Sequence, residues 1–248
     1  MFFWLLTPII AYNWILIVAA VVPAIALLVK VYRSDRLERE SPFLIGSLVI
    51  SGIISTFFAL ISERIFSALL VRLVPAGTKT FNILLYFGVV AISEELSKYV
   101  LLRKRTWLNA EFNCQYDGIV YATAVSLGFA LWENISYVTM YGFSTAVVRA
   151  VTAIPGHACF GVFMGVFYSL AKSNDYLGNK SKSDFFNTLA IIIPVILHGA
   201  YDYIASIEIA HSGWYFIAFV VVLFAASFIL VNRMAKNERY LARPWRVI

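Results

Sequence analysis

Residues 43–62, FLIGSLVISGIISTFFALIS, form an apolar run without a single charged side chain. A transmembrane helix needs about 20 consecutive, mainly apolar residues, because the hydrocarbon core of a bilayer is about 30 Å thick. Six further apolar stretches cover approximately residues 8–30, 81–102, 117–141, 145–171, 185–206 and 213–232. The sequence therefore predicts an all-α, polytopic membrane bundle of about seven transmembrane helices.

The composition of the 248-residue chain agrees with this interpretation. Apolar residues make up 61% and charged residues 14%, against roughly 45–50% and 25% in soluble domains, and the mean hydropathy is +0.80. These values exclude a soluble globular enzyme, a disordered tail and a secreted disulfide scaffold. The N-terminal segment lacks the basic region and cleavage site of a signal peptide, so we expect it to be retained. We expect one membrane-embedded domain over residues 1–248, with its core at about 20–230.

Lysine and arginine are distributed unevenly between alternate connections of the predicted helices. Fifteen of the twenty are expected on one side: Lys30, Arg33, Arg36, Arg39, Arg103, Lys104, Arg105, Lys172, Lys180, Lys182, Arg233, Lys236, Arg239, Arg243 and Arg246. Three (Arg64, Arg72 and Lys79) are expected on the other. Because basic loops stay in the cytoplasm, we expect the N-terminus outside and a basic cytoplasmic tail at 233–248. The net charge of +6 then needs no nucleic-acid partner. Residues 63–76 fit either an extension of the second helix or an amphipathic interfacial segment.

Eight ionisable side chains fall inside four successive predicted spans. They are Glu94, Glu95, Lys98, Glu133, Arg149, His157, His198 and Asp202. A charge at the centre of a membrane helix costs about 2.5–3.5 kcal/mol on insertion scales, so such groups usually face the bundle interior and serve function. One instance alone is compatible with a structural ion pair. Eight on four helices indicate a functional polar centre.

Helical spacing links the first three of these side chains. Lys98 follows Glu94 by four residues and Glu95 by three, so its ammonium can reach either carboxylate. Adjacent residues cannot share one helix face, so we expect one carboxylate in a cavity and the other on Lys98 or a neighbouring helix. The alternative is a helix end near the cytoplasmic surface, with Lys98 extending toward water.

The two histidines in the spans have different settings. Asp202 lies four residues after His198, where a carboxylate can fix the imidazole tautomer, although a buried ion pair has the same spacing. His157 is followed by Gly161 and Gly165, which give one helix face room for close packing. A packed, hydrogen-bonded core histidine is the alternative for His157. The third histidine, His211, falls in a short outside loop and is expected at the surface.

Carboxylates and histidines on facing helices suit two kinds of chemistry. They could hold Zn²⁺ with one open position, or a glutamate could act directly as a general base on water. The sequence lacks His-Glu-x-x-His, and neither histidine has a second histidine four residues away. It also lacks a Gly-rich phosphate loop, a Gly-x-Ser-x-Gly elbow and a Cys-His nucleophile pattern.

Four motifs in order, each on its own predicted helix, make the chain resemble a known family. They are EELSK at 94–98, FALWEN at 129–134, His157 with Gly165 behind it and Arg149 before it, and HGAYD at 198–202. Together they resemble the PrsW family of membrane-embedded glutamic proteases, which are related to the CAAX-processing and bacteriocin-processing membrane proteases. The resemblance extends over about residues 20–230.

The resemblance implies an intramembrane-sited endopeptidase, a multi-pass protein of the bacterial cytoplasmic membrane. The best-known role in the family is the first cut in an anti-sigma factor, which starts the release of a sigma factor. The expected partners are therefore a membrane-protein substrate, such as a single-span anti-sigma factor, and the lipid bilayer.

Our hypothesis for the reaction is hydrolysis by an activated water, without a covalent acyl-enzyme and without a cofactor. Glu94 or Glu95 would deprotonate the water, and one of the two histidines would help to hold it. The other histidine, with Asn134 as a candidate donor, would stabilise the oxyanion. Asp202 would orient His198, and Glu133 would either share the role of the base or bind the catalytic histidine. Lys98 and Arg149 are assigned to charge balance, and Phe129 is a supporting residue.

Three other readings use the same residues. A metalloprotease would use the Glu/His cluster as zinc ligands, and metal analysis separates it from a metal-free enzyme. A proton-coupled transporter would use buried carboxylates and histidines as a relay, but the inverted repeats common in transporters are not visible. A membrane receptor or scaffold could retain the family fold without activity.

Overall fold

Helices make up nearly all of the chain that the structure describes. The computed structural model describes residues 3–207 and 212–241, with the side chains of 3–13 and 16 left aside. The elements are α1 (Phe3–Ser34), α2 (Pro42–Leu73), α3 (Lys79–Ile83), the π-helical segment η1 (Leu84–Ala91), α4 (Ile92–Thr106), α5 (Asp117–Tyr141), α6 (Phe143–Val151), α7 (Ala153–Tyr176), α8 (Lys180–Ser206) and α9 (Ser212–Lys236). Within the described ranges the only β-pairing is an isolated bridge between Cys114 and Tyr240. The predicted all-α class is confirmed.

Among the described residues, six helical stretches are long and apolar enough to cross a membrane: α1, α2, α5, α6 with α7, α8 and α9. The predicted span at 81–102 is also helical, but it is divided among α3, η1 and α4. Each of these three pieces is too short to cross a membrane alone. The segment 63–76, which the sequence left open, mostly extends α2, which ends at Leu73.

The predicted span at 145–171 is broken near its start. The backbone at Thr152 has φ −121° and ψ −72°, outside helical geometry, and separates α6 from α7. This break was not predicted, although Pro155 lies three residues after Thr152, in the first turn of α7, where a proline is tolerated because its missing N–H needs no partner within the helix. Arg149 precedes this break and His157 follows it, and both side chains line the same cavity.

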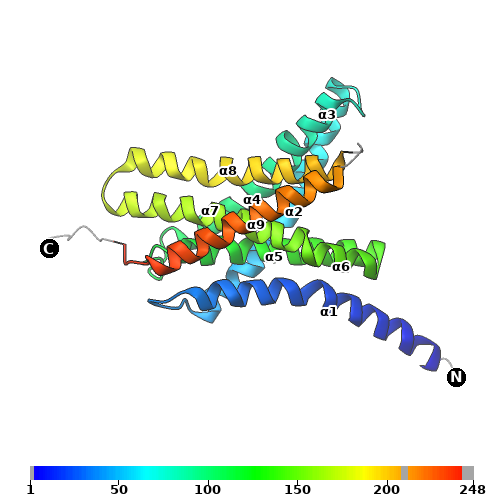
Figure 1. Cartoon of the computed structure of the whole chain (residues 1–248), viewed down its shortest axis with the longest axis horizontal. Helices are drawn as coiled ribbons and strands as arrows, with labels where there is room; N and C mark the ends of the chain where they lie inside the picture. Colours follow the sequence, from blue (N-terminus) through cyan, green and yellow to red (C-terminus); the bar gives the residue numbers. More distant parts are fainter. Residues whose placement is uncertain (1–2, 208–211, 242–248) are drawn as a thin grey trace.

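Helix α5 forms the centre of the bundle. It contacts α7, α2 and α1, and its residues from Asp117 to Ala130 are buried. Figure 1 shows α5 and α7 between α1 on one side and α8 on the other. The outer helices expose large apolar side chains, such as Val221 and Val222 of α9. Such a surface suits contact with lipid, because the membrane interior removes the cost of exposing apolar side chains.

Glycines allow the central helices to approach closely. A Cβ at Gly128 of α5 would lie 2.1 Å from the carbonyl oxygen of Val49 in α2, and one at Gly165 of α7 would lie 2.5 Å from that of Gly118. A Cβ at Gly161 would also meet α5, at Ser126. The close packing predicted for the glycine face behind His157 is confirmed.

Replacing Gly128 by Val is expected to destabilise the bundle strongly, because the side chain would collide with backbone that cannot move aside. Overpacking typically costs about 1–3 kcal/mol and occasionally more. Gly46→Val on α2 is the matched control, since nothing lies within 4 Å of a Cβ there. Thermal unfolding of the detergent-purified protein measures both. Equal unfolding midpoints for the two variants would contradict this packing.

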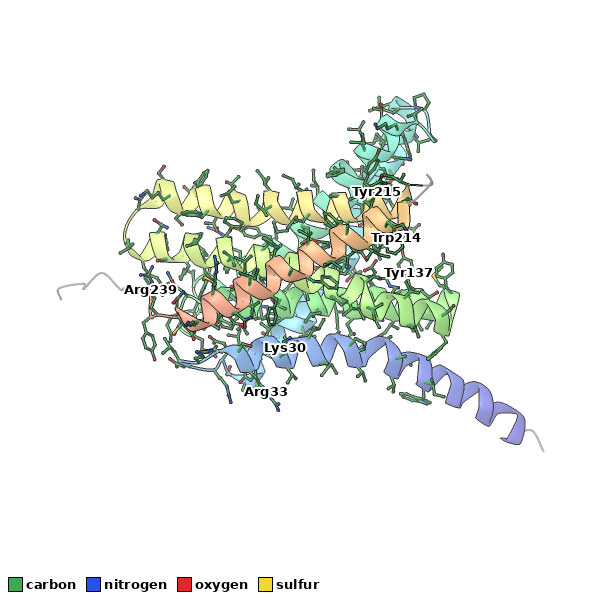
Figure 2. The ribbon with its side chains drawn as sticks, viewed as in Figure 1. Lys30, Arg33, Tyr137, Trp214, Tyr215 and Arg239 are labelled. Atoms are coloured by element: carbon green, nitrogen blue, oxygen red, sulfur yellow. The ribbon has the colours of Figure 1, made fainter. Side chains whose placement is uncertain are left out.

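The two ends of the bundle differ in their side chains. Lys30, Arg33 and Arg239 lie toward one end, and Tyr137, Trp214 and Tyr215 lie toward the other (Figure 2). Aromatic side chains are enriched at membrane interfaces, and Lys and Arg on the cytoplasmic side. Helix α1 begins at the aromatic end and α9 finishes at the basic end (Figure 1). The basic end is thus the expected cytoplasmic end, although the tail residues 242–248 lie outside the described part.

Candidate active site

A cavity of about 440 Å³ gathers most of the predicted site residues. Its polar lining comes from α2, η1, α4, α5, α6, α7 and α8: Thr56, Glu63, Tyr86, Glu94, Glu133, Tyr137, Arg149, His157, His198, Tyr201, Asp202 and Ser206. Many of these lie in the later turns of α2, α5 and α8, which run toward the aromatic end of the bundle. Tyr137, one of the lining residues, is seen at that end in Figure 2.

Two local features place the motifs around the cavity. The π-helical segment η1 immediately precedes α4, which carries Glu94; single π turns are frequent at functional sites. In α8, Pro194 lies four residues before His198, where a proline removes one backbone hydrogen bond and favours a kink. Gly199 lets α8 approach η1, because a Cβ there would lie 2.5 Å from the ring of Phe87.

Lys98 is the fully buried cation behind the cavity. Its Nζ lies 2.7 Å from Glu95 Oε1, 3.2 Å from Glu94 Oε2 and 3.2 Å from His157 Nδ1. It also sits 3.9 Å from the centre of the Phe129 ring. The expected pairing with both carboxylates is confirmed, and the alternative of Lys98 reaching toward water is wrong, because its side chain has no exposed surface.

The two adjacent carboxylates have different surroundings. Glu94 lines the cavity, whereas Glu95 is fully buried behind it. Glu95 Oε1 accepts hydrogen bonds from Lys98 and from His198 Nδ1, the latter at 2.8 Å. The geometry therefore separates one carboxylate that faces the cavity from one that holds two other side chains in place.

His198 lies among three carboxylates. Its Nδ1 is 2.8 Å from Glu95 Oε1, and its Nε2 is 3.3 Å from Asp202 Oδ2 and 3.9 Å from Glu94 Oε2. Carboxylates only accept hydrogen bonds when ionised, so satisfying both sides needs an N–H on each ring nitrogen. This arrangement describes an imidazolium at the cavity wall, stacked on Phe160 with ring centres 4.8 Å apart.

His157 links Lys98 to the carboxylate of Glu133. An ammonium has no acceptor, so Nδ1 accepts from Lys98 and the proton lies on Nε2, which donates to Glu133 Oε2 at 2.8 Å. Glu133 also pairs with Arg149 Nη2 at 2.9 Å. Of the two roles left open for Glu133, the structure shows contact with a histidine. Both ring nitrogens of His157 are occupied in this arrangement.

Asn134 does not lie in the cavity, and the geometry does not support its predicted contact with an oxyanion. The side chain is fully buried; it donates to the Ala20 carbonyl at 3.0 Å and accepts from Arg149 Nε at 3.0 Å. Asn134 thus holds α5 against α1 and positions Arg149. Adjacent helix residues point in different directions, so Glu133 and Asn134 cannot both face the cavity. His211 lies outside the described residues.

One acidic side chain of the cavity was not predicted from the sequence. Glu63 of α2 lines it, although the predicted span ended one residue earlier, at 62. The hydroxyl-bearing side chains of Thr56, Tyr86 and Tyr201 were also missed, because such residues are common in membrane helices and carry no specific signal. The cavity lining is therefore strongly acidic, with four carboxylates against Arg149 and a protonated His198.

Three of the predicted site residues have donor atoms spaced for a metal ion. One atom each from Glu94, Glu95 and His198 lies within 4.8 Å of the other two. The second carboxylate oxygen of Glu95 is buried without a hydrogen-bond partner. Lys98 already bonds to both carboxylates, so a metal would share them with its ammonium. The donor set nevertheless fits a zinc site with three protein ligands and one open position.

Comparisons with known proteins agree with the arrangement of these motifs. The family model "PrsW family intramembrane metalloprotease" matches residues 40–231. Protease PrsW of Oceanobacillus iheyensis is 33% identical over 75% of this chain and 80% of its own length. Protease PrsW of Geobacillus kaustophilus is 31% identical over 94% and 96%, and that of Bacillus subtilis 32% identical over 84% and 90%. No solved structure shows a significant match.

Proposed function

The chain belongs to the PrsW family of intramembrane proteases, and from this premise we propose that it cuts a membrane-protein substrate with a water molecule activated in the cavity by Glu94. The observation that carries this proposal is the separation of the two carboxylates. Glu94 lines the cavity, whereas Glu95 is buried behind it and bonded to Lys98 and His198.

In the proposed reaction the Glu94 carboxylate takes a proton from water, and the resulting hydroxide attacks the carbonyl carbon of the scissile peptide. The negative charge that develops on the carbonyl oxygen faces the two cations of the lining, Arg149 and His198. Glu94 then returns its proton to the peptide nitrogen as the C–N bond breaks, which releases an amine and a carboxylic acid.

The remaining side chains hold this arrangement. Glu95 and Asp202 fix His198 through its two ring nitrogens. Glu133 positions Arg149 and His157, and Asn134 holds the Nε of Arg149. Lys98 balances the charge of the two glutamates from behind the cavity. Preorganised groups of this kind stabilise charge without reorganising during the reaction.

We propose that the substrate is a single-span anti-sigma factor in the bacterial cytoplasmic membrane, and that the cut lies on its outer side. Tyr137, which lines the cavity, lies toward the aromatic end of the bundle in Figure 2, opposite the basic end expected in the cytoplasm. A cavity at that end suits a cut on the outer side of the membrane.

The position of the cut can be measured in cells. Candidate single-span anti-sigma factors, tagged at both ends, are co-expressed with the wild type and with Glu94→Gln. We expect a wild-type-specific fragment that retains the cytoplasmic tag and the transmembrane span. A fragment cut on the cytoplasmic side would contradict the proposed orientation of the site. Absence of a fragment from every anti-sigma factor tested would contradict the substrate.

A zinc-dependent protease is the second candidate, favoured by the spacing of the Glu94, Glu95 and His198 donors. When bound, zinc would activate a water and polarise the peptide carbonyl. If the metal-free mechanism holds, the purified protein keeps its full cleavage rate after dialysis against a strong chelator. Loss of activity on chelation, restored by one equivalent of Zn²⁺, would replace it with the zinc mechanism. Elemental analysis of the same samples serves as the control.

A further inference from the structure

Three buried carboxylates meet far from the cavity, at the basic end of the bundle. Asp35 and Glu40 belong to the connection between α1 and α2, and Asp117 begins α5. One oxygen from each lies within 4.8 Å of the other two. Their exposed fractions are 4%, 4% and 0%. Glu133 follows Asp117 by sixteen residues on α5, about 24 Å along the helix axis, so this acidic trio is separate from the proposed active site.

Hydrogen bonds leave much of this acidic trio unsatisfied. Within the described residues, both carboxylate oxygens of Asp35 and the Oδ1 of Asp117 are buried without a hydrogen-bond partner. Asp117 Oδ2 accepts from the backbone N–H groups of Asn113 and Cys114. Within residues 3–207 and 212–241, no Lys or Arg side chain forms an ion pair with any of the three. Buried charges normally have such partners or bind metals.

A separate side chain also faces this acidic trio without a partner. The hydroxyl of Tyr121, one turn after Asp117 on α5, is completely buried and lies against Glu40, and within the described residues it has no hydrogen-bond partner of good geometry. Two neighbouring acids add to the negative charge. Glu111 accepts from the Ser41 N–H and hydroxyl, and Glu238 accepts from the N–H groups of Arg36 and Leu37.

The electrostatics of the two loop carboxylates agree with a missing positive charge. Burial, with Glu238 nearby, raises the pKa of Asp35 to about 7, and Arg39 offsets this only slightly. Burial, with Asp117 nearby, raises the pKa of Glu40 to about 9. At neutral pH such groups either retain protons or need a cation between them.

We propose that Asp35, Glu40 and Asp117 bind a divalent cation that prefers oxygen ligands, Mg²⁺ or Ca²⁺. The trio offers oxygen donors alone, as these hard cations require, and its donor spacing is within the span of one coordination sphere. The ion would tie the α1–α2 connection to the start of α5. It would thus anchor the helix that carries Glu133 and Asn134 at its other end, as a structural ion.

The proposal predicts opposite effects of one substitution with and without the ion. In chelator, Asp35→Asn is more stable than the wild type, because it removes a buried, unpaired charge. With millimolar Mg²⁺ or Ca²⁺ the wild type gains several degrees in its unfolding midpoint, rising with ion concentration, and Asp35→Asn does not. Thermal unfolding of the full-length protein in detergent measures this. Separate Mg²⁺ and Ca²⁺ series show which ion binds.

Elemental analysis provides a readout independent of stability. The wild type is expected to hold one more equivalent of Mg²⁺ or Ca²⁺ than Asp35→Asn. Any metal bound at Glu94 and Glu95 is present in both proteins and therefore does not contribute to this difference. Glu40→Gln should behave like Asp35→Asn if the latter does not fold. Asp184→Asn is the control, since it removes an exposed carboxylate on α8 that pairs with Lys180.

Three results would overturn the proposal. The first is equal metal content and equal ion response in the wild type and in both trio variants. The second is binding of Zn²⁺ alone that depends on Cys114, which would assign the ion to the neighbouring group of Cys114, Asp117 and Glu238. The third is a wild type whose stability does not depend on metal, together with a loss of stability in Arg243→Gln or Arg246→Gln. That result would mean that an arginine supplies the positive charge.

Discussion

Replacing Glu94 by Gln abolishes substrate cleavage and leaves the helix bundle folded. Glutamine has nearly the shape of glutamate and its amide oxygen can still accept from Lys98, which lies 3.2 Å from Glu94. It cannot take a proton from water. Loss of a general base typically lowers the rate by about 10²–10⁴. Cleavage rates in isolated membranes, with protein amounts matched by blotting, measure the effect.

Two further variants test whether Glu94→Gln loses activity because a general base is removed or because the cavity loses a negative charge. Glu63→Gln removes a carboxylate from the same lining, on the opposite helix α2, and should reduce the rate much less than Glu94→Gln. Glu95→Gln should also inactivate, but through the position of His198, so its melting temperature should fall as well. If Glu95→Gln stayed folded and lost more activity than Glu94→Gln, the base would be Glu95.

Replacing Lys98 by Met destabilises the protein more than any other single change in the site. The ammonium bonds to two buried carboxylates and to His157, and Met fills a similar volume without charge. Removing one partner of a buried ion pair costs about 3–5 kcal/mol, because the remaining charge has no compensation. Expression level and thermal unfolding in detergent measure this loss.

A triple variant tests whether Lys98 acts through charge. Combining Lys98→Met with Glu94→Gln and Glu95→Gln removes the cation and both anions together. We expect this variant to recover much of the stability and none of the activity, because neutral replacement of a whole buried ion cluster is often tolerated. A triple variant as unstable as Lys98→Met alone would assign Lys98 a packing role, through its contact with Phe129.

The all-α fold class and most of the candidate site residues could be predicted from the sequence. Apolar runs mark the spans because lipid leaves helices as the simplest way to satisfy the backbone. Charged residues within those runs marked the centre: six of the eight line the cavity, and Lys98 and Glu95 bond directly to residues that do. The motifs that resemble the PrsW family contain these same charged residues.

What the sequence could not provide depends on tertiary packing. The spacing of Glu94 and Glu95 shows that only one faces the cavity, but the rotation of α4 against α8 decides which. The π-helical segment before Glu94 has no marker residue, and the break at Thr152 is marked only by Pro155 in the first turn of α7. The acidic trio of Asp35, Glu40 and Asp117 comes from two separate segments, so only the folded chain reveals it.

The most direct test of the account is hydrolysis by the purified protein reconstituted in lipid vesicles with one single-span substrate. Mass spectrometry of the products identifies the bond. We expect two fragments whose masses add to that of the substrate plus one water, formed by the wild type and not by Glu94→Gln. Cleavage by Glu94→Gln at the wild-type rate would contradict the central claim that Glu94 activates water in this cavity.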